Sequence, residues 1–468
     1  MGNVAAHPGT GFAPRDGRGS SRQEAFLCWA YLCFLLLLTI YQDFPLKNMI
    51  GEIGRTPIIM MMPVFAASEV HLLLRSKKLR LETGMQKNML LFVLYLAFVS
   101  LTYVMVQYMQ ANFALGSEKL LVKAIKVLIY FLLILLYVRH MHRVLHRASM
   151  LGVLHRAFWM VFLFLMAVML VELATIPRAL TFLHSSPNPY WRVRLLTSES
   201  STTGTIMVVF GAVLLELSRK LHRLGRQLAN IGVVAGVGLY AAVTSSKGFL
   251  IVLFLTVIIM MLRMLDIRRA RNIVMLVVIG SGAYFAFKYL SGGVISSLQN
   301  DMQNYTSLYT RLGTVLIAVI TVLHHPFGVG TGAFVIYFNT YLDTAIDWMG
   351  SMFNTLMGYT SINTTELATY ADSDKNLGVK SGFFQWIMYG GAGALLFFTH
   401  LFRWTRAHIG PSVVLMAAFI FILLSLLFIS LDIKYEVWLF FTFIGVSSIR
   451  EDAARQKRDR FERSNRLQ

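Results

Sequence analysis

Apolar residues occur along this chain in long continuous runs that short polar segments separate. A helix needs roughly 20 apolar residues to cross the ~30 Å hydrocarbon core of a bilayer. The runs are continuous rather than alternating, so they do not indicate the strands of a membrane barrel. The pattern predicts an all-α polytopic membrane protein with about twelve transmembrane helices, at residues 25–41, 57–74, 89–109, 121–138, 158–176, 205–218, 228–245, 249–265, 273–290, 381–402, 413–431 and 437–449.

Composition supports a membrane protein. Of the 468 residues, 56% are hydrophobic and 14% are charged, whereas soluble domains carry about 25% charged residues. Cys28 and Cys33 both lie in the first apolar run, and they indicate neither a disulfide framework nor a zinc site. No small-residue cleavage site follows this run, so we expect an uncleaved transmembrane helix rather than a signal peptide.

The net charge of +20 is explained by topology rather than by nucleic acid. Lys and Arg cluster in alternate loops, and such loops face the cytoplasm. Both termini are therefore expected in the cytoplasm, with two long loops, 177–204 and 291–380, on the periplasmic side. The expected organisation is a disordered cytoplasmic leader at 1–24, one transmembrane domain at 25–449 and a basic cytoplasmic tail at 450–468.

The segment 291–380 is the longest part of the second half without a continuous apolar run. Long loops that separate membrane spans often bind or catalyse. It contains Arg311 and the sequence His324-His325-Pro326-Phe327-Gly328-Val329-Gly330-Thr331-Gly332. No strand precedes these glycines, so a nucleotide-binding loop is disfavoured. We expect Pro326 and the glycines to end a helix and to let two backbones approach closely.

Loops rich in Lys and Arg usually face the cytoplasm, so cations on the expected outer side call for a functional explanation. They are Arg192, Arg194, Lys247, Arg311 and Lys380. Arg binds phosphate oxygens in pairs and Lys offers a point charge, so these residues could bind a diphosphate at the membrane surface. Alternatively, Arg192 and Arg194 extend toward lipid phosphates and Lys247 caps a helix.

Histidines and carboxylates near the span ends give weaker signals. His140, His142, His146 and His155 share one basic stretch without Cys or carboxylate, which favours a basic face against anionic lipid over a metal site. Carboxylates inside membranes are usually functional, but that inference weakens near an interface. Glu69, Glu172 and Glu216 lie near span ends. We predict no metal site and no cofactor.

Several short motifs, in order, resemble the O-antigen polymerase and O-antigen ligase superfamily of bacterial inner membranes. The resemblance covers roughly residues 190–400. Its matches are Ser246-Lys247-Gly248, Arg311, the run from His325-Pro326-Phe327-Gly328 to Phe334, and Gly390-Gly391-Ala392-Gly393.

Three further positions bear on this resemblance, and two of them distinguish the two branches of the superfamily. Glu199-Ser200-Ser201 is similar to the Glu-Pro-Ser sequence of polymerase members. Lys247 stands where many members have Arg, which keeps the charge and loses the planar fork. Lys380 stands where ligases in particular have His. The Glu199 match and the Lys380 mismatch both favour a polymerase.

The resemblance implies a GT-C-like, metal-independent glycosyltransferase that polymerises oligosaccharide repeat units linked to undecaprenyl diphosphate. It implies a multi-pass protein of the bacterial inner membrane that works at the periplasmic face, inverts the anomeric centre and needs a separate chain-length regulator as partner. By this reading Arg192, Arg194, Lys247, Arg311 and Lys380 bind the diphosphate. Glu199 is the first candidate for the base and His325 the second.

Two rival functions stay open. One is an O-antigen ligase, which transfers finished polymer to lipid A core. The other is a lipid-oligosaccharide flippase, which twelve spans with both ends in the cytoplasm would suit. Against the flippase we weigh the lack of repeated halves, the expected absence of paired interrupted helices and the asymmetric long loop.

Overall fold

The computed structural model describes residues 22–78, 81–244, 246–264, 307–358, 363–371, 373 and 377–449. The predicted span at 273–290, the basic tail and nearly all of the leader lie outside these residues. The described part is helical, apart from one short β-hairpin, β1 (Ala114–Leu115) with β2 (Glu118–Lys119).

Seven helical segments in the described part are long and apolar enough to cross a membrane. They are α1 (Arg22–Ile40), Pro57–Ser76, which joins η2 (Pro57–Met61) to α3 (Met62–Ser76), α4 (Gly84–Met109), α5 (Leu120–Met150), α6 (Leu154–Thr175), α7 (Ser200–Ser218) and α8 (Arg223–Val243). The chain is therefore an all-helical membrane protein. Twelve spans, and the side that each loop faces, stay predictions.

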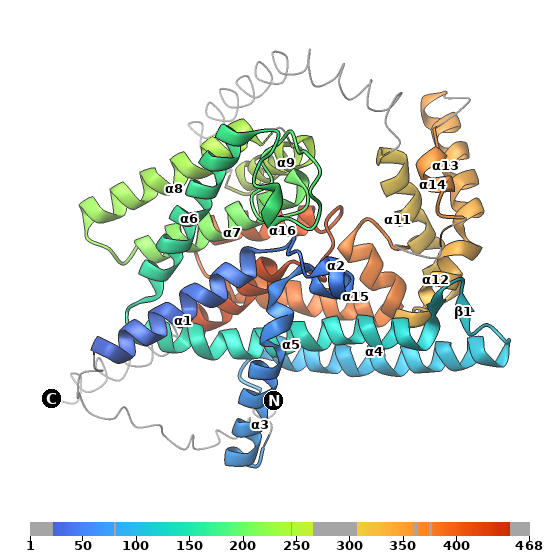
Figure 1. Ribbon diagram of the computed structural model, residues 1–468, viewed down its shortest axis with the longest axis horizontal. Helices are drawn as coiled ribbons and strands as arrows, with labels where there is room; N and C mark the ends of the chain where they lie inside the picture. Colours follow the sequence, from blue (N-terminus) through green and yellow to red (C-terminus); the bar gives the residue numbers. More distant parts are fainter. Residues whose placement is uncertain are drawn as a thin grey trace.

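The remaining helices complete the bundle. They are α9 (Lys247–Met264), α11 (Ser307–His324), α12 (Gly330–Thr340), α13 (Leu342–Met357), α14 (Thr365–Ala368), α15 (Gly382–His408), α16 (Val413–Ser425) and a last helix, Tyr435–Ile449. Short turns of helix connect some of them: α2 (Lys47–Ile50), η1 (Glu52–Arg55) and η3 (Thr181–Leu183). Figure 1 shows α11 to α14 gathered at one side and α7 and α8 toward the other.

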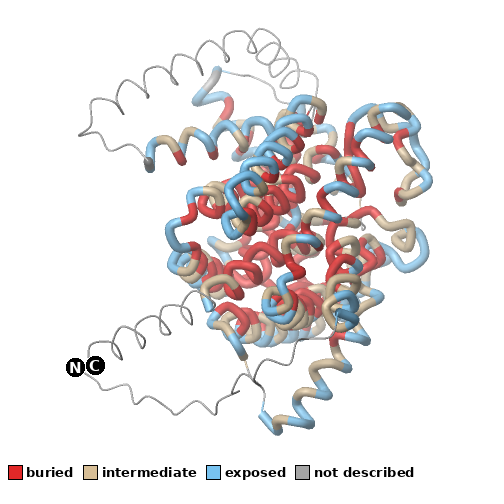
Figure 2. The backbone as a smooth tube through the Cα atoms, turned by 90° about the vertical axis from the view of Figure 1, so that its left-hand side faces the viewer, coloured by how far each residue is buried: buried red, intermediate tan, exposed pale blue. Residues whose placement is uncertain are grey.

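Aromatic rings fill the core where α4, α5, α15 and the last helix meet. Trp386 and Trp438 are fully buried and stack with their ring centroids 5.7 Å apart. Phe92 stacks on Trp386 at 5.7 Å, and Phe131 lies 4.4 Å from the same indole. Buried residues gather in the centre of the bundle (Figure 2). Large rings contribute much buried area and prefer defined geometries, so this cluster fixes how the four helices pack.

The segment 291–380 is not irregular where the structure describes it, because α11 to α14 occupy most of its described residues. Its place on the outer side of the membrane stays a prediction. Helix α12 packs against both α4 and α5. A Cβ on Gly330 would lie 2.5 Å from the Ser100 Cα, and one on Gly332 would lie 2.6 Å from the Leu120 oxygen. Gly and Thr dilute the apolar signal in the sequence, yet small residues are what allows helices to approach this closely.

Two interrupted helices interlock at the glycine motifs. The chain breaks between α11 and α12, and α15 breaks at Gly391, whose φ is 49° and ψ is −128°. Val329 N donates to Met388 O at 3.1 Å, and Ala392 N donates to Pro326 O at 2.8 Å. The predicted role of Pro326 and the glycines, ending a helix and permitting backbone contact, is confirmed. The expected absence of paired interrupted helices is wrong.

We expect Gly328→Ala to destabilise the protein. Gly328 has φ of +81°, and a Cβ there would lie 2.4 Å from the Tyr389 oxygen. A left-handed non-glycine residue and an overpacked contact together cost about 2–4 kcal/mol. Thermal unfolding in detergent measures the loss. Gly238→Ala in α8 is the control, because nothing lies within 4 Å of the added Cβ. Equal midpoints for both variants would contradict the interlock.

Candidate functional site

The turn between α16 and the last helix is the centre of the candidate site. The sequence predicts a span over 413–431, but α16 ends at Ser425 and the turn occupies residues 426–434. Phe428 N and Ile429 N both donate to Ser425 O at 3.0 Å, which closes a turn at the end of α16. We call this segment the 426–434 turn.

A buried ion pair joins the 426–434 turn to α7 and to the segment that follows α1. Lys434 and Glu436 are at most 1% exposed, with Nζ 3.6 Å from Oε1. Lys434 Nζ also donates to Gln42 Oε1 and to the Thr202 carbonyl, both at 2.6 Å. Glu436 accepts hydrogen bonds from Thr205 Oγ1 at 2.6 Å and from Gln42 Nε2. Because each charge has several partners, the pair offsets much of its desolvation cost.

The same turn holds α11 and α15. Arg311 Nη1, on α11, donates to the Phe428 carbonyl at 3.0 Å. At the start of α15, Gly382 N donates to Ile429 O at 2.7 Å, and Ser381 Oγ donates to Leu426 O at 3.0 Å. These backbone acceptors are available because the turn interrupts the helical hydrogen bonds.

The turn brings three of the five predicted diphosphate-binding cations toward one region. Arg311 contacts it directly. Lys247 begins α9 next to Gly248, whose added Cβ would lie 3.8 Å from the Phe428 ring. Lys380 precedes Ser381, is exposed, and places Nζ 5.8 Å from the Tyr370 ring centroid. Helices α7, α9 and α15 begin here, and helix N-termini attract anions.

The sequence suggested that Arg194 is a surface cation, but the structure buries it. It is 3% exposed, and its guanidinium lies 4.7 Å from the Tyr190 ring centroid. Burial lowers the pKa of this guanidinium, and Asp43 and Glu172 oppose the shift. Among the described residues, its Nε and Nη2 have no hydrogen-bond partner. Arg194 therefore belongs to a buried wall of the site.

That buried wall is a chain of carboxylates and histidine. The Asp43 carboxylate lies 2.9 Å from His184 Nδ1 and accepts from Ser185 Oγ at 2.5 Å. Burial alone would raise the pKa of Asp43, but these bonds hold it below its usual range. Glu172 Oε1 lies 4.0 Å from His184 Nε2, and its Oε2 accepts from the Leu195 backbone N–H at 2.8 Å. The wall thus ties α1, α6 and the 177–199 segment together.

Glu199, the first candidate base, is exposed directly before α7. Its backbone oxygen accepts from the Thr197 and Thr202 hydroxyls, both at 2.9 Å, which fixes its position. Burial lowers the pKa of the Lys434 ammonium, while Glu436 and more weakly Glu199 oppose the shift. Arg192 is also exposed in this segment. Glu199 therefore lies at the edge of the cation cluster.

His325, the second candidate base, lies elsewhere. Its Nδ1 lies 3.2 Å from the Tyr103 hydroxyl of α4, and its ring packs on Tyr337 of α12 with centroids 4.5 Å apart. Figure 1 shows α12 and α7 on different sides of the molecule. Burial, and to a lesser degree His324, lowers the pKa of His325. The structure does not bring His325 together with Glu199.

Sequence reasoning missed several residues of this site. Lys434, Glu436 and Asp432 form a short charged sequence between two apolar runs, which was a usable signal. Glu172 was discounted for its place near a span end, yet it is fully buried. Arg55, whose Nη2 donates to Ser198 Oγ at 2.5 Å, gave no signal at all.

The four histidines at 140–155 do not form a common face. His140 Nε2 lies 2.7 Å from the Tyr31 hydroxyl, His142 pairs with Glu82, and His155 accepts from Trp159 Nε1 at 3.0 Å. Three of them thus have separate partners inside the protein, so a shared basic face against lipid is wrong for them. Across the described ranges, no group of three or more His, Cys, Asp or Glu could hold a metal ion.

Comparison with known proteins assigns no family. No family model matches the chain, and a search of curated proteins finds no match.

We expect Lys434→Met to cost about 3–5 kcal/mol of stability, because it leaves the Glu436 carboxylate buried and unpaired. The double variant Lys434→Met/Glu436→Gln should recover most of this loss. Unfolding of the unchanged protein and of both variants in the same detergent gives the loss of unfolding free energy for each variant. Additive losses would show that the two charges do not interact.

Stability should also depend on the protonation of Asp432. Burial raises the pKa of this carboxyl from 3.8 to about 6, although Trp386 Nε1 donates to it. The folded state then binds this proton more tightly than the unfolded state, so stability falls as pH rises from about 4 to about 6. Asp432→Asn should make the unfolding midpoint less dependent on pH over this range. Asp343→Asn, at an exposed position on α13, should not. Identical pH profiles for both variants would refute this assignment.

Proposed function

We propose that this protein polymerises oligosaccharide repeat units carried on a polyprenyl diphosphate such as undecaprenyl diphosphate, at the outer face of a bacterial inner membrane. The observation that carries the proposal is the 426–434 turn, near which Arg311, Lys247 and Lys380 lie together with the N-termini of α9 and α15. Fixed cations and helix N-termini favour an anionic group, and a diphosphate linked to lipid is available at a membrane surface.

The chemistry follows from the bond that breaks. A sugar hydroxyl of the incoming unit attacks the anomeric carbon of the growing glycan from the side opposite the diphosphate, which inverts the centre. The carbon–oxygen bond to the diphosphate breaks and its electron pair stays on that leaving group. Arg311 and Lys247 stabilise this negative charge. The hydroxyl proton passes to the Glu199 carboxylate, which is exposed at the edge of the cluster.

The other cations have different parts in this proposal. Lys380 is exposed before α15 and can reach a bound headgroup, and Arg192 is exposed in the 177–199 segment. Arg194 supports the wall behind the site rather than contacting the phosphates. Lys434 is held by Gln42, Thr202 and Glu436, so it positions the N-terminus of α7, while Glu436 neutralises its charge.

Within the same superfamily a ligase is the alternative. Lys380, which stands where ligases in particular carry His, favours polymerisation. The two differ in a deletion strain: loss of a polymerase leaves single repeat units on the lipid A core, and loss of a ligase leaves the core bare.

A lipid-oligosaccharide flippase is the second candidate function. The observation in its favour is the pair of interlocked helix breaks at residues 325–329 and at Gly391, since many transporters build their sites from interrupted helices. Purified protein in detergent separates the two, because polymerisation needs no second compartment. Flipping in proteoliposomes without polymerisation in detergent would reverse the assignment.

We expect Arg311→Ala and Lys247→Ala to shorten the polymer ladder on a gel, each lowering polymer yield by about tenfold or more, as loss of a transition-state charge contact does. The assay compares strains with equal amounts of the membrane protein. Arg178→Ala, an exposed cation in the 177–199 segment, is the matched control and should leave the ladder unchanged. Unaltered ladders in both Arg311→Ala and Lys247→Ala would rule out the diphosphate site.

A further inference from the structure

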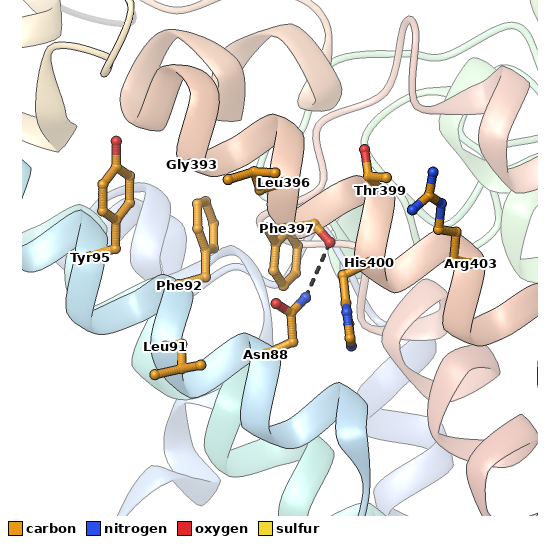
Figure 3. Close-up of a pocket in the computed structure, with 10 residues that line it drawn as sticks. All are labelled: Asn88, Leu91, Phe92, Tyr95, Gly393, Leu396, Phe397, Thr399, His400 and Arg403. Carbon is orange, nitrogen blue, oxygen red and sulfur yellow. Dashed lines mark hydrogen bonds between the residues drawn. The ribbon is translucent and has the colours of Figure 1, made fainter. Parts of the chain in front are cut away.

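A groove lies on the surface of the bundle beside the C-terminal half of α15, whereas the site described above lies at the start of that helix. It runs between α4 and α15, has a volume of about 420 Å³, and contains no residue of the proposed polymerase site. This volume is within the range of small-ligand sites, roughly 300–1,000 Å³. Figure 3 shows α4 and α15 side by side, with the lining side chains in a row along them.

The middle of the groove is apolar and faces outward. Phe92 and Phe397 are buried and stack with centroids 4.5 Å apart, forming the floor. Leu91 is 56% exposed and Leu396 is 72% exposed, so they form the rims. In a protein whose other helices span a bilayer, exposed leucines beside a hollow face acyl chains rather than water.

Tyr95 and Gly393 bound one end of the groove. Gly393 packs against Tyr95, since a Cβ on that glycine would lie 2.2 Å from the ring. The Tyr95 hydroxyl lies 2.8 Å from the Phe327 oxygen and 3.0 Å from the Gly390 oxygen, so the interlocked helix breaks hold it.

The other end is polar and basic. Arg403, His400 and Thr399 are exposed there on the last turns of α15, and Asn88 lies opposite them near the start of α4 (Figure 3). Asn88 Nδ2 donates to the Phe397 oxygen at 3.1 Å, which holds the two helices together at this point. Within the part of the chain that the structure describes, the lining includes no carboxylate.

The loops at this end of both helices are basic. Arg75, Lys77 and Lys78 precede α4, and Arg406 follows Arg403. By the charge rule for membrane proteins this end faces the cytoplasm, where the leaflet is rich in anionic lipid. The groove thus matches both parts of an amphiphile: its apolar middle fits an acyl chain, and its basic end places a cation where a headgroup phosphate would lie.

We propose that this groove binds one anionic glycerophospholipid of the cytoplasmic leaflet. Its phosphate lies at Arg403 and His400, and one acyl chain lies between Leu91 and Leu396 on the Phe92–Phe397 floor. The site is independent of the polymerase proposal, because it shares no residue with it and faces the opposite leaflet.

The experiment uses the full-length protein in vesicles that contain phosphatidylcholine and a small fraction of phosphatidylglycerol bearing a photoreactive group on one acyl chain. After illumination, mass spectrometry maps the labelled peptides. We expect label on residues 88–97 and 393–403. Arg403→Gln should lower this labelling about fivefold, which corresponds to about 1 kcal/mol for one headgroup charge. Leu396→Trp, which fills the slot, should lower it for any lipid.

The matched control is Arg406→Gln, which removes a cation from the same helix end outside the groove and should leave the labelling unchanged. Equal losses in Arg403→Gln and Arg406→Gln would mean a diffuse basic surface and would overturn the proposal. Equal labelling by photoreactive phosphatidylcholine would do the same, since the headgroup would then not be recognised. Stronger labelling by photoreactive undecaprenyl phosphate would assign the groove to the carrier lipid and overturn the proposed occupant.

Discussion

The arrangement of this protein depends on one buried pair of charges, Lys434 and Glu436. An ammonium and a carboxylate cannot leave water at a tolerable cost unless other polar groups surround them. Here Gln42 comes from the end of α1, and Thr202 and Thr205 come from α7. Burial of the pair therefore requires the ends of these helices to meet. The adjoining 426–434 turn then exposes the backbone acceptors that hold Arg311 of α11 and Ser381 before α15.

A second constraint is the close contact of backbones at the glycine motifs. Gly328 and Gly391 leave no room for a side chain on either segment. Because α15 is locked at its break, its two ends have fixed positions: Lys380 and Ser381 beside the 426–434 turn, and Arg403 at the basic end of the α4–α15 groove. One helix thus connects the proposed headgroup sites of the two leaflets. Its break at Gly391 lies between them.

The sequence allowed part of the candidate site to be found. Arg311, Lys247 and Lys380 stood out because cations on the expected outer side oppose the topological bias, and the structure brings all three toward one turn. The sequence could not show that Arg194, unlike these three cations, is buried. Its burial depends on the wall formed by Asp43, His184 and Glu172, which come from three distant segments. His325 became the second candidate for the base because it matched a motif, and motif order carries no information about distance.

By itself the sequence determined that this is a helical membrane protein, since the length and continuity of its apolar runs leave few other ways to satisfy the backbone in lipid. It also determined that Pro326 and the glycines after it end a helix, because their allowed backbone angles are a local property. Only the tertiary structure decided that residues 307–340 form helices packed within the bundle. Only it decided that the span at 413–431 ends early, at Ser425. Both outcomes depend on partners distant in sequence: α4 and α5 for the first, and Arg311 and Ser381, which bond the backbone after Ser425, for the second.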